Sequence, residues 1–339
     1  MMKSKIPDKT EMIHLINEIR EEIGHKKVPL HINNISYTPD TDELWIITPD
    51  RPDKSGIIGK GGWVIGKLRE KLGIGTIHVE SYTDTLLNNY QMTLALEALE
   101  KHPTHKQLKN LKQHLKLKID TQHSFNYPHH LKTTKYTKNP DNERVIVALS
   151  GGADSSFSLI LAQHLGLNPI AITINPGNIV LPKHFLNNIN NLTEKLNIEH
   201  HYLDVDFEEI IKGSLEGRYH PCGRCSKKIH QKVKDFAIEK NIKIVIFGDM
   251  TATGYQSIHD ENELTIINLP ALLTAGKQEI NTLTNEYNVI PSKKFGCPLL
   301  IETTKKHPHM KQYSIQRILR ETRSGVLEPG QALNLIKNL

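Results

Sequence analysis

The segment Arg144–Gly166, "RVIVALSGGADSSFSLILAQHLG", decides the fold of the larger part of this 339-residue chain. Its first residues, "RVIVAL", form an apolar run typical of a strand that is buried in a parallel sheet. A glycine-rich loop, Ser150–Ser156, and an apolar helix follow. A strand, loop and helix in this order present backbone amides at the helix N-terminus, where they can bind phosphate. The loop is not a Walker loop, because no Gly-Lys-Ser/Thr follows, and it lacks the dinucleotide-binding fingerprint.

The rest of the chain alternates between strand-like and helix-like stretches. The pattern predicts three further strands and two helices: strands at 168–177, 198–206 and 242–250, helices at 182–197 and 226–241. This rhythm predicts an α/β fold with a doubly wound, mostly parallel sheet. Ligands of such sheets bind beyond the carboxyl ends of the strands, where Ser150–Ser156 and Gly248–Thr251 are expected to lie.

The loop and its surroundings resemble the PP-loop ATP pyrophosphatases, of the adenine nucleotide α-hydrolase-like fold. Their signature, S-G-G-x-D-S after the first strand, is complete at Ser150–Ser155, and the resemblance covers about residues 142–300. The resemblance implies that ATP is split between its α- and β-phosphates and that the adenylate is placed on a substrate oxygen. It also implies which residues surround the pyrophosphate: Ser150, Gly151, Gly152 and Ser155.

Two acidic residues are candidates for the metal chemistry of this site. By the same resemblance, Asp154 helps to hold Mg²⁺. Asp249, at the end of the predicted strand 242–250, is a candidate for a second metal ligand or substrate-binding carboxylate. A plain cap on the next helix is the alternative for Asp249.

The chain has three cysteines, and two of them are close together in "HPCGRCSKKIHQ", residues 220–231. Cys222 and Cys225 precede a basic helix, and Cys297 lies far downstream. The helix dipole is expected to lower the pKa of the Cys222 and Cys225 thiols. The nearby basic side chains of Arg224, Lys227 and Lys228 should lower it further. The residues alone leave three possibilities open. They are a redox dithiol, a zinc site completed by a histidine such as His220 or His230, and an iron–sulfur cluster on three thiolates.

Among PP-loop proteins, a C-x-x-C before a basic helix with one later cysteine resembles the tRNA thiolation enzymes. These include the 2-thiocytidine, 2-thiouridine and methanogen-type 4-thiouridine synthetases. The resemblance implies that Cys222, Cys225 and Cys297 hold a [4Fe–4S] cluster whose open iron binds sulfide. It further implies an ATP-dependent tRNA sulfurtransferase that adenylates a pyrimidine carbonyl oxygen. Its partners would be tRNA and a sulfur donor, either free sulfide or a carrier protein.

Several features of those enzymes are missing, so the modified nucleoside stays open. The terminal zinc-binding C-x-x-C pairs, a rhodanese-like domain and a THUMP domain have no counterpart in the sequence. Two other functions also remain: a PP-loop enzyme that uses a catalytic dithiol, a persulfide or an amine donor, and an RNA-binding protein without thiolation activity.

The N-terminal region reads as helix, strand, strand, helix, loop, helix, strand, an α+β pattern. Within it, Ile58–Ile65, "IGKGGWVI", fits the I-G-x-x-G-x-x-I signature of the KH domain, whose prokaryotic type has this order of elements. The resemblance implies a small KH-like domain that holds single-stranded RNA on a loop made of Gly59, Lys60, Gly61 and Gly62. We expect Trp63 to pack into the core rather than to stack on a base.

Composition and charge set the remaining expectations. The net charge is +6, and residues 101–140 hold nine lysines and six histidines against one acid, Asp120. That segment is either a solvated, partly disordered linker or a phosphate-binding arm. No apolar run approaches membrane-spanning length and no signal peptide is visible, so a cytoplasmic protein with reduced thiols is expected. A homodimer is one option for its assembly. The C-terminal helix carries three arginines near one face, which is either a solvated surface, the favoured interpretation, or an extra phosphate contact: Arg317, Arg320 and Arg323.

The sequence thus predicts four parts. They are a KH-like RNA-binding domain at 1–100, a basic linker at 101–140, a PP-loop domain at 141–300 and a helical extension at 301–339.

Overall fold

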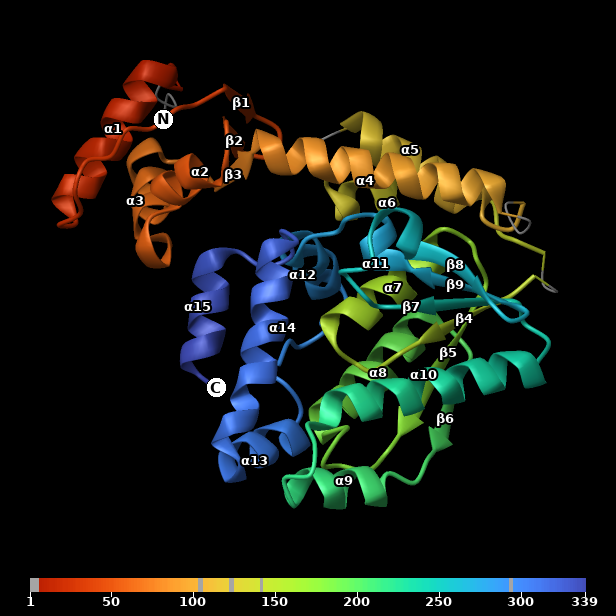
Figure 1. The fold of residues 1–339 in the computed structure, drawn as a ribbon. Coiled ribbons are helices and arrows are strands. Elements are labelled where there is room, and N and C mark those ends of the chain that lie inside the picture. The colour runs from red at the N-terminus through yellow and green to blue at the C-terminus, as the bar shows by residue number, and fades with distance from the viewer. Residues whose placement is uncertain (1–5, 103–105, 122–124, 141–142, 293–294) are drawn as a thin grey trace. The chain divides into compact units, whose positions relative to one another are not determined.

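The computed structural model describes residues 6–102, 106–121, 125–140, 143–292 and 295–339. The chain forms two compact units, Met1–Asn89 and Tyr90–Leu339, and the boundary between them falls inside helix α4 (Tyr82–Lys101) (Figure 1). The predicted start of the PP-loop domain, at 141, lies outside the described residues. None of the helices in the described ranges has both the length and the apolar character that crossing a membrane requires.

The first unit has the element order that the sequence predicts. Its elements are α1 (Lys9–Glu22), β1 (Asn34–Thr38), β2 (Glu43–Thr48), α2 (Arg51–Ile58), a short 3₁₀ turn η1 (Lys60–Gly62), α3 (Trp63–Leu72) and β3 (Thr76–Ser81). The strands form one sheet in the order β1-β2-β3, with β1 antiparallel and β3 parallel to β2. Alternate residues of β2, Leu44 and Ile46, pack against the apolar faces of the helices, so the sheet has one covered face.

The second unit is built on a six-stranded sheet in the order β6-β5-β4-β7-β9-β8. The strands are β4 (Val145–Ala148), β5 (Pro169–Asn175), β6 (His200–Asp204), β7 (Ile244–Phe247), β8 (Ile258–Glu261) and β9 (Leu264–Asn268). All pairs are parallel except β8 with β9, which confirms the predicted mostly parallel α/β sheet. The order of strands reverses at β4, because β5 and β6 follow on one side of it and β7 lies on the other.

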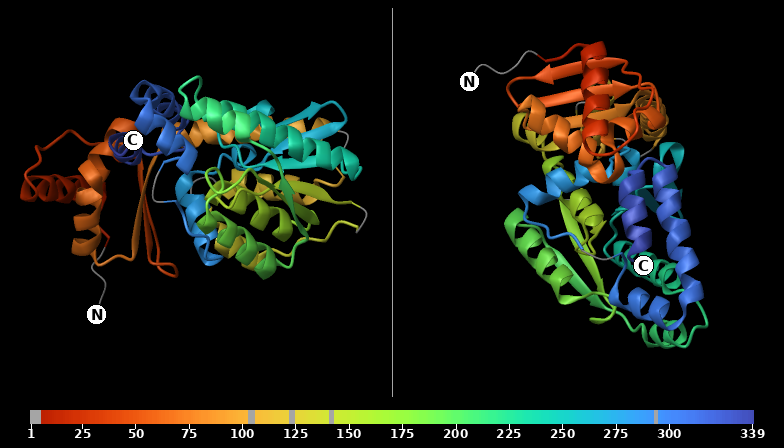
Figure 2. Two further views of the ribbon diagram at one scale, coloured as in Figure 1. Left: turned by 90° about the horizontal axis from the view of Figure 1, so that it is seen from below. Right: turned by 90° about the vertical axis from the view of Figure 1, so that its left-hand side faces the viewer.

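Helices cover both faces of this sheet, and Figure 2 shows α10 on one side and α8 on the other. Successive side chains of β4 point to opposite faces of the sheet. Val145 and Val147 therefore belong to the hydrophobic core on one face, and Ile146 belongs to the core on the other face. The remaining helices are α7 (Ala153–His164), α8 (Lys183–Leu196), α9 (Glu208–Leu215), α10 (Pro221–Glu239), α11 (Leu269–Leu272), α12 (Lys277–Glu286), α13 (Pro298–Lys306), α14 (Lys311–Arg323) and α15 (Pro329–Lys337). Two more 3₁₀ turns are η2 (Gly254–Ser257) and η3 (Pro308–Met310).

The described parts of the basic segment 101–140 are folded rather than solvated. They form α5 (Lys109–Thr121) and α6 (Tyr127–Thr133), whose apolar side chains join the same core as α7. Leu111 and Leu115, one helical turn apart, are fully buried there. The apolar residues between the lysines therefore fold this segment onto the core of the second unit, because their burial outweighs the cost of ordering it.

Two basic residues of α5 are buried together with this apolar face. The ammonium of Lys118 lies 2.8 Å from the carboxylate of Glu279 on α12 and donates to the Tyr127 hydroxyl at 3.1 Å. Burial, with the charge of Lys118 beside it, lowers the pKa of His114 to about 3, so this imidazole is neutral at physiological pH. Neither side chain can serve as an exposed contact to phosphate.

Candidate active site

The point where the strand order reverses places two loops side by side. β4 leads into Ser150–Ser155 and the neighbouring β7 leads into Gly248 and Asp249. A Cβ atom on Gly248 would lie 3.0 Å from the backbone nitrogen of Ser155 and 3.1 Å from the carbonyl carbon of Asp154. The two loops therefore touch, and a side chain at position 248 would require the backbone of the neighbouring loop to shift. Ligand sites of open α/β sheets lie at this kind of position.

The loop at 150–155 is held in shape by its own serines. The hydroxyl of Ser155 accepts from the backbone nitrogen of Ser150 at 3.1 Å and donates to the Gly152 carbonyl at 3.2 Å. Gly151 has φ +75°, and a Cβ atom there would lie 2.5 Å from the carbonyl oxygen of Phe185. Gly152 caps α7 without a side-chain hydrogen bond. The first amides of α7 thus keep the arrangement that binds an anion at a helix N-terminus.

The carboxylate of Asp154 is paired with a lysine that the sequence analysis did not identify. Lys277, the first residue of α12, donates to both oxygens of Asp154, at 2.6 and 2.7 Å. Glu279 fixes the start of α12 by accepting from the backbone nitrogen of Gly276 at 2.9 Å. The stretch "GKQE" reads as a helix start, but only the fold shows that this start meets the phosphate loop.

A second missed residue, Asn188 on α8, ties the loop to a distant segment. Its amide nitrogen donates to the carbonyls of Gly151 and Ile290, both at 2.9 Å, and its oxygen accepts from the nitrogen of Ile290 at 3.1 Å. Asn188 is only 4% exposed, so these bonds are protected from water. Nothing in the sequence singles out Asn188, because it is one of four asparagines in this helix.

Asp249 orders the loop after β7. One carboxylate oxygen accepts from the backbone nitrogens of Thr251 and Ala252, at 2.6 and 3.1 Å, and from the Thr251 hydroxyl at 3.1 Å. The next helical turn, η2, has Thr253 as its N-cap instead. Asp249 is exposed and adjoins Gly248, so its carboxylate lies at the edge where the predicted ligand would bind.

The three thiols come from two helix starts. Cys222 and Cys225 lie in the first turns of α10, which begins at Pro221, rather than before the helix as the sequence suggested. Cys297 is the N-cap of α13. The helices α10 and α13 are in contact, and Cys225 and Cys297 belong to one apolar cluster. All three cysteines are free thiols. The contact between α10 and α13 brings Cys297 to the other two, although it is far from them in the sequence.

The prediction that Cys222 and Cys225 have lowered pKa values is wrong. Burial raises the pKa of Cys222 to about 11, against an opposing effect of Arg317. Burial and the neighbouring thiols Cys297 and Cys222 raise the pKa of Cys225 to about 12. Two of the nearby basic side chains point elsewhere: Arg224 lies 4.0 Å from the centre of the Tyr219 ring, and Lys228 donates to the Asp206 carbonyl.

Arg317 on α14 lies beside the segment that precedes Cys297, with its guanidinium 5.5 Å from the centre of the Phe295 ring. Burial acts to lower its pKa, but the charges of Glu321, Cys222 and Asp154 outweigh this effect and raise it. The guanidinium therefore lies within electrostatic reach of both the loop acid and the first cysteine. In the sequence, Arg317 is only one of three arginines near one helix face.

The histidines proposed for zinc do not join the thiols. His230 stacks on Phe247 at 4.1 Å between ring centres, and His220 lies against Tyr313 at 5.4 Å. Within the described ranges, no group of three or more His, Cys, Asp and Glu side chains converges on one metal-ion position. A cluster with iron at several corners is wider than one ion, so thiols too far apart to share an ion can still hold it.

In the first unit, the loop Gly59–Gly62 joins α2 to α3. Gly59, Gly61 and Gly62 have φ between +66° and +76°, and Lys60 is exposed. Trp63 is 67% exposed, so the expectation that it packs into the core is wrong. The indole lies at the start of α3 beside the loop, because its neighbour Val64 takes the inward-facing position.

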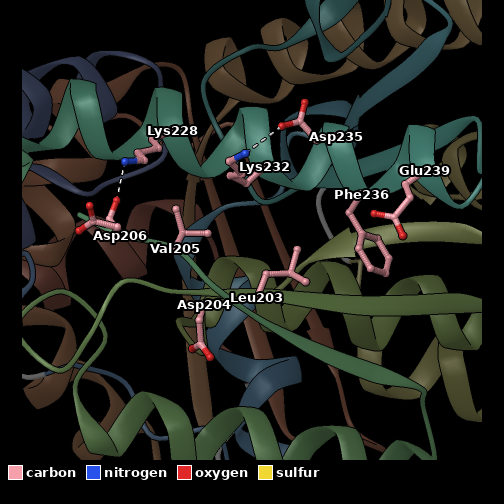
Figure 3. A pocket seen from close by; sticks show the side chains of 9 residues that line it. All are labelled: Leu203, Asp204, Val205, Asp206, Lys228, Lys232, Asp235, Phe236 and Glu239. Carbon is pink, nitrogen blue, oxygen red and sulfur yellow. Dashed lines mark hydrogen bonds and ion pairs between the residues drawn. The ribbon is translucent and has the colours of Figure 1, made fainter. Parts of the chain in front are cut away.

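A pocket of ≈ 490 Å³ lies between the end of β6 and α10, away from the phosphate loop (Figure 3). Lys228 and Lys232 of α10 and the acids Asp204 and Asp206 line it. Lys232 is paired with Asp235 at 3.3 Å. The residues that line this pocket include none of those predicted for catalysis, and the mixed charges favour no particular ligand.

Comparisons with known proteins agree with the phosphate-loop domain. Residues 144–256 match the family model described as queuosine biosynthesis protein QueC. The tRNA-specific 2-thiouridylase MnmA 2 of Fusobacterium nucleatum is 31% identical over 125 residues, which are 34% of this chain and 36% of that enzyme. The structure of the U34-tRNA thiolase NcsA from Methanococcus maripaludis with its [4Fe–4S] cluster aligns with 16% identity and a TM-score of 0.35, over 62% of this chain and 74% of that one.

The match to one archaeal protein is much longer. MJ1638 of Methanocaldococcus jannaschii, described as uncharacterized, is 32% identical over 251 residues. These residues make up 74% of this chain and 92% of that protein. The similarity thus extends well beyond the residues matched by the QueC model. The chain belongs to the family of the M. jannaschii protein MJ1638.

Proposed function

We propose that this protein is an ATP-dependent tRNA sulfurtransferase, which adenylates a pyrimidine carbonyl oxygen and replaces it with sulfur. The observation that carries the proposal is the presence, in one unit, of a complete phosphate loop and three free thiols that the fold brings together. The match to the QueC family model and the partial similarity to 2-thiouridylases support an enzyme of this type.

In the first step the phosphate loop binds the part of ATP that leaves. Amides at the start of α7 and the loop held by Ser150 and Ser155 would receive the β- and γ-phosphates. Lys277 would balance the charge that develops on the departing pyrophosphate, as a preorganised cation does in a phosphoryl-transfer site. The base oxygen then attacks the α-phosphorus, and pyrophosphate leaves with the bonding electrons.

Asp154 fits the role of a Mg²⁺ ligand. Its carboxylate already attracts a cation, the ammonium of Lys277, which contacts both oxygens. Asp249, on the touching loop, would be the second acidic group near the metal. The hard oxygen donors of these two side chains suit Mg²⁺, which is bound through one or two carboxylates plus substrate phosphates.

The three thiols fit a [4Fe–4S] cluster better than the other groups considered. Cys222, Cys225 and Cys297 are the only cysteines in the chain and offer three soft ligands without an added histidine. When bound, such a cluster would supply an open iron that carries the sulfide.

The first unit would hold the RNA. Its loop offers the exposed Lys60, glycines that let a phosphate backbone approach, and the exposed indole of Trp63 beside them. A pyrimidine must leave its stack before it can enter an active site, at a cost of about a few kcal/mol. A second contact that keeps the strand in place lowers the chance that the RNA dissociates while the base is unstacked.

The test is the replacement of Cys297 by serine in protein purified without oxygen. We expect loss of iron and of visible absorbance, no thiolated nucleoside by mass spectrometry of the tRNA, and AMP formation that persists at least in part. Ser226→Ala is the matched control, because Ser226 is exposed on α10 next to Cys225 and carries no sulfur. Full iron and full thiolation in Cys297→Ser would contradict the proposal, and iron-free but active parent protein would favour a catalytic dithiol.

A further inference from the structure

The ammonium of Lys118 on α5 is buried at a point where α5, α6 and α12 meet. It lies 2.8 Å from Oε1 and 3.0 Å from Oε2 of Glu279 on α12, and it donates to the Tyr127 hydroxyl on α6 at 3.1 Å. The ring centres of Tyr127 and Phe125 are 5.0 and 5.6 Å away. Lys118 is only 4% exposed, and the proposed reaction does not use this buried charge.

Glu279 connects Lys118 to the start of α12. Its Oε2 accepts from Lys118 and also from the backbone nitrogen of Gly276, at 2.9 Å. Lys277 is the next residue and the first of α12, and its ammonium contacts both carboxylate oxygens of Asp154, at 2.6 and 2.7 Å. Three polar contacts therefore lead from Lys118 to the phosphate loop.

Tyr127 connects the same ammonium to α7, the helix that begins in the phosphate loop. Its ring packs edge-on against Phe157, with 5.1 Å between the ring centres. Phe157 is three residues after Asp154 on α7. Lys118 thus contacts groups that lead to both partners of the Lys277–Asp154 pair. A buried hydrogen-bonded cation in this position can fix the spacing of the two helices, because water does not replace its partners.

Stability alone is a poor reason for this buried ion pair. Removing two charges from water costs free energy, and apolar side chains of similar volume in their place are often neutral or stabilising. Leu111 and Leu115, seven and three residues before Lys118, are fully buried on the same face of α5. An apolar side chain at position 118 would therefore also suit this core, and what it would not provide is a fixed direction for Glu279.

We propose that Lys118 is a positioning residue of the phosphate site, which fixes the direction of Lys277 through Glu279. Lys277 must be in place before pyrophosphate leaves, because a cation that first has to move stabilises the developing charge less. Without Lys118, the Glu279 side chain, which is 27% exposed, would be free to turn towards water and release the Gly276 amide. The inference rests on the ATP step of the proposed function and does not depend on sulfur transfer.

The experiment measures binding of inorganic pyrophosphate with Mg²⁺ to the full-length protein by calorimetry, and formation of AMP from ATP and tRNA. Lys118→Met should weaken pyrophosphate binding and lower kcat, each about tenfold, because a small misplacement of a site cation has a large effect. KM for tRNA should stay within about twofold, since RNA contacts are unchanged. Lys116→Met is the matched control, an exposed lysine on the same helix that pairs with Glu100, and should change none of these values.

The Lys277→Ala background separates positioning from a general structural role. If Lys118 acts through Lys277, Lys118→Met should cause no further loss of pyrophosphate binding in Lys277→Ala protein, because residues that act as a unit are not additive. The inference would be overturned if Lys118→Met weakened binding by the same factor in both backgrounds. Parent-like pyrophosphate binding in the single variant Lys118→Met would overturn it as well.

A double variant, Lys118→Met with Glu279→Gln, covers the case in which the single variant fails to fold. It leaves no unpaired charge in the core, and glutamine can still cap the helix, so thermal melting should resemble that of the parent. Pyrophosphate binding should still be about threefold weaker or more, because α12 is no longer held by α5. Parent-like binding in this variant would contradict the inference.

The same measurements distinguish this inference from the proposed function. A parent protein that does not bind pyrophosphate would overturn the assignment of the phosphate site, and the role of Lys118 with it. If all the binding results were as expected but no thiolated nucleoside formed, only the sulfur-transfer proposal would fail, and the role of Lys118 would stand.

Discussion

The chain contains two glycine-rich loops that lead into helices, and they are built in opposite ways. In Ser150–Ser155 the serines bond to the loop backbone, Asn188 holds the Gly151 carbonyl, and Lys277 covers the acid. In Gly59–Gly62 the three glycines have positive φ, Lys60 is exposed, and the indole of Trp63 stands out from the surface. One loop is fixed by internal bonds and the other is open.

The difference follows from what each loop is proposed to bind. A pyrophosphate is small and compact, so its site needs amides in fixed positions and cations already in place. A single RNA strand is long and flexible, and its backbone needs clearance, charge and a surface on which a base can stack. Glycine serves both loops, but in the first it permits close packing and in the second it permits approach from outside.

The largest effect is expected at the acid of the closed loop. Asp154→Ala should lower the release of AMP and pyrophosphate by about 100-fold or more, because it removes the proposed metal ligand and the partner of Lys277. RNA binding should stay within about twofold, since the open loop is untouched. Asp204→Ala is the control, an exposed acid at the end of β6 in the same sheet. Undiminished pyrophosphate release by Asp154→Ala would show that the two loops are not specialised as described.

The next effect tests how tightly each loop is packed. Gly151→Ala should lower the free energy of unfolding by about 2–5 kcal/mol, from a left-handed backbone and a clash with the Phe185 carbonyl. Gly61→Ala should cost about 1–2 kcal/mol, because it has the strained backbone but meets only the side chain of Trp63, at 3.3 Å. Urea titration of both variants gives the comparison. Equal losses would mean that the closed loop is no more constrained than the open one.

A charge reversal at the open loop, Gly59–Gly62, should weaken RNA binding and leave the ATP-dependent chemistry unchanged. Lys60→Asp combined with Gly61→Asp should weaken tRNA binding by about tenfold to 100-fold at low salt, because two carboxylates would face phosphates. ATP-dependent chemistry measured at saturating tRNA should be nearly unchanged. The measurement is a binding titration at several salt concentrations, with Lys67→Asp as a control on the same unit. Parent-like binding at matched salt would exclude the loop as an RNA contact.

The smallest effect concerns the indole. Trp63→Ala should weaken binding of single-stranded RNA about fivefold to tenfold, the lower part of the range for one base stacked on an aromatic side chain. The loss should be less dependent on salt than that of the charge reversal. Trp63→Phe should restore most of it. If Trp63→Ala lowered the thermal stability but left RNA binding unchanged, the role of Trp63 would be structural.

The sequence is sufficient for features that depend on neighbouring residues. The buried strand, the phosphate loop and α7 are contiguous, and their spacing alone predicts the order that the structure has. The same holds for the first unit, where helix and strand periods are clear. In both places local hydrophobic pattern and tertiary packing act in the same direction, so a local interpretation suffices.

The sequence alone does not predict contacts between distant segments, or properties that depend on how deeply a side chain is buried. Lys277 and Asp154 are 123 residues apart, and nothing in either segment indicates the other. The pKa of Cys225 was misjudged because proximity to basic residues in sequence says little about where their side chains point. The exposure of Trp63 was missed for the related reason that large aromatic residues are usually buried.

The helices α5 and α6 have a consequence for how this protein can be recombined. They carry Leu111, Leu115 and Tyr127 into the core around α7, and Lys118 reaches across 161 positions of sequence to Glu279, which fixes the start of the helix bearing Lys277. A second unit cut at residue 141 would lose one wall of its core and the residue that fixes the start of the helix bearing Lys277. Evolution, or an engineer, could exchange the first unit, up to Asn89, for another module, but the segment after it must stay with the second unit.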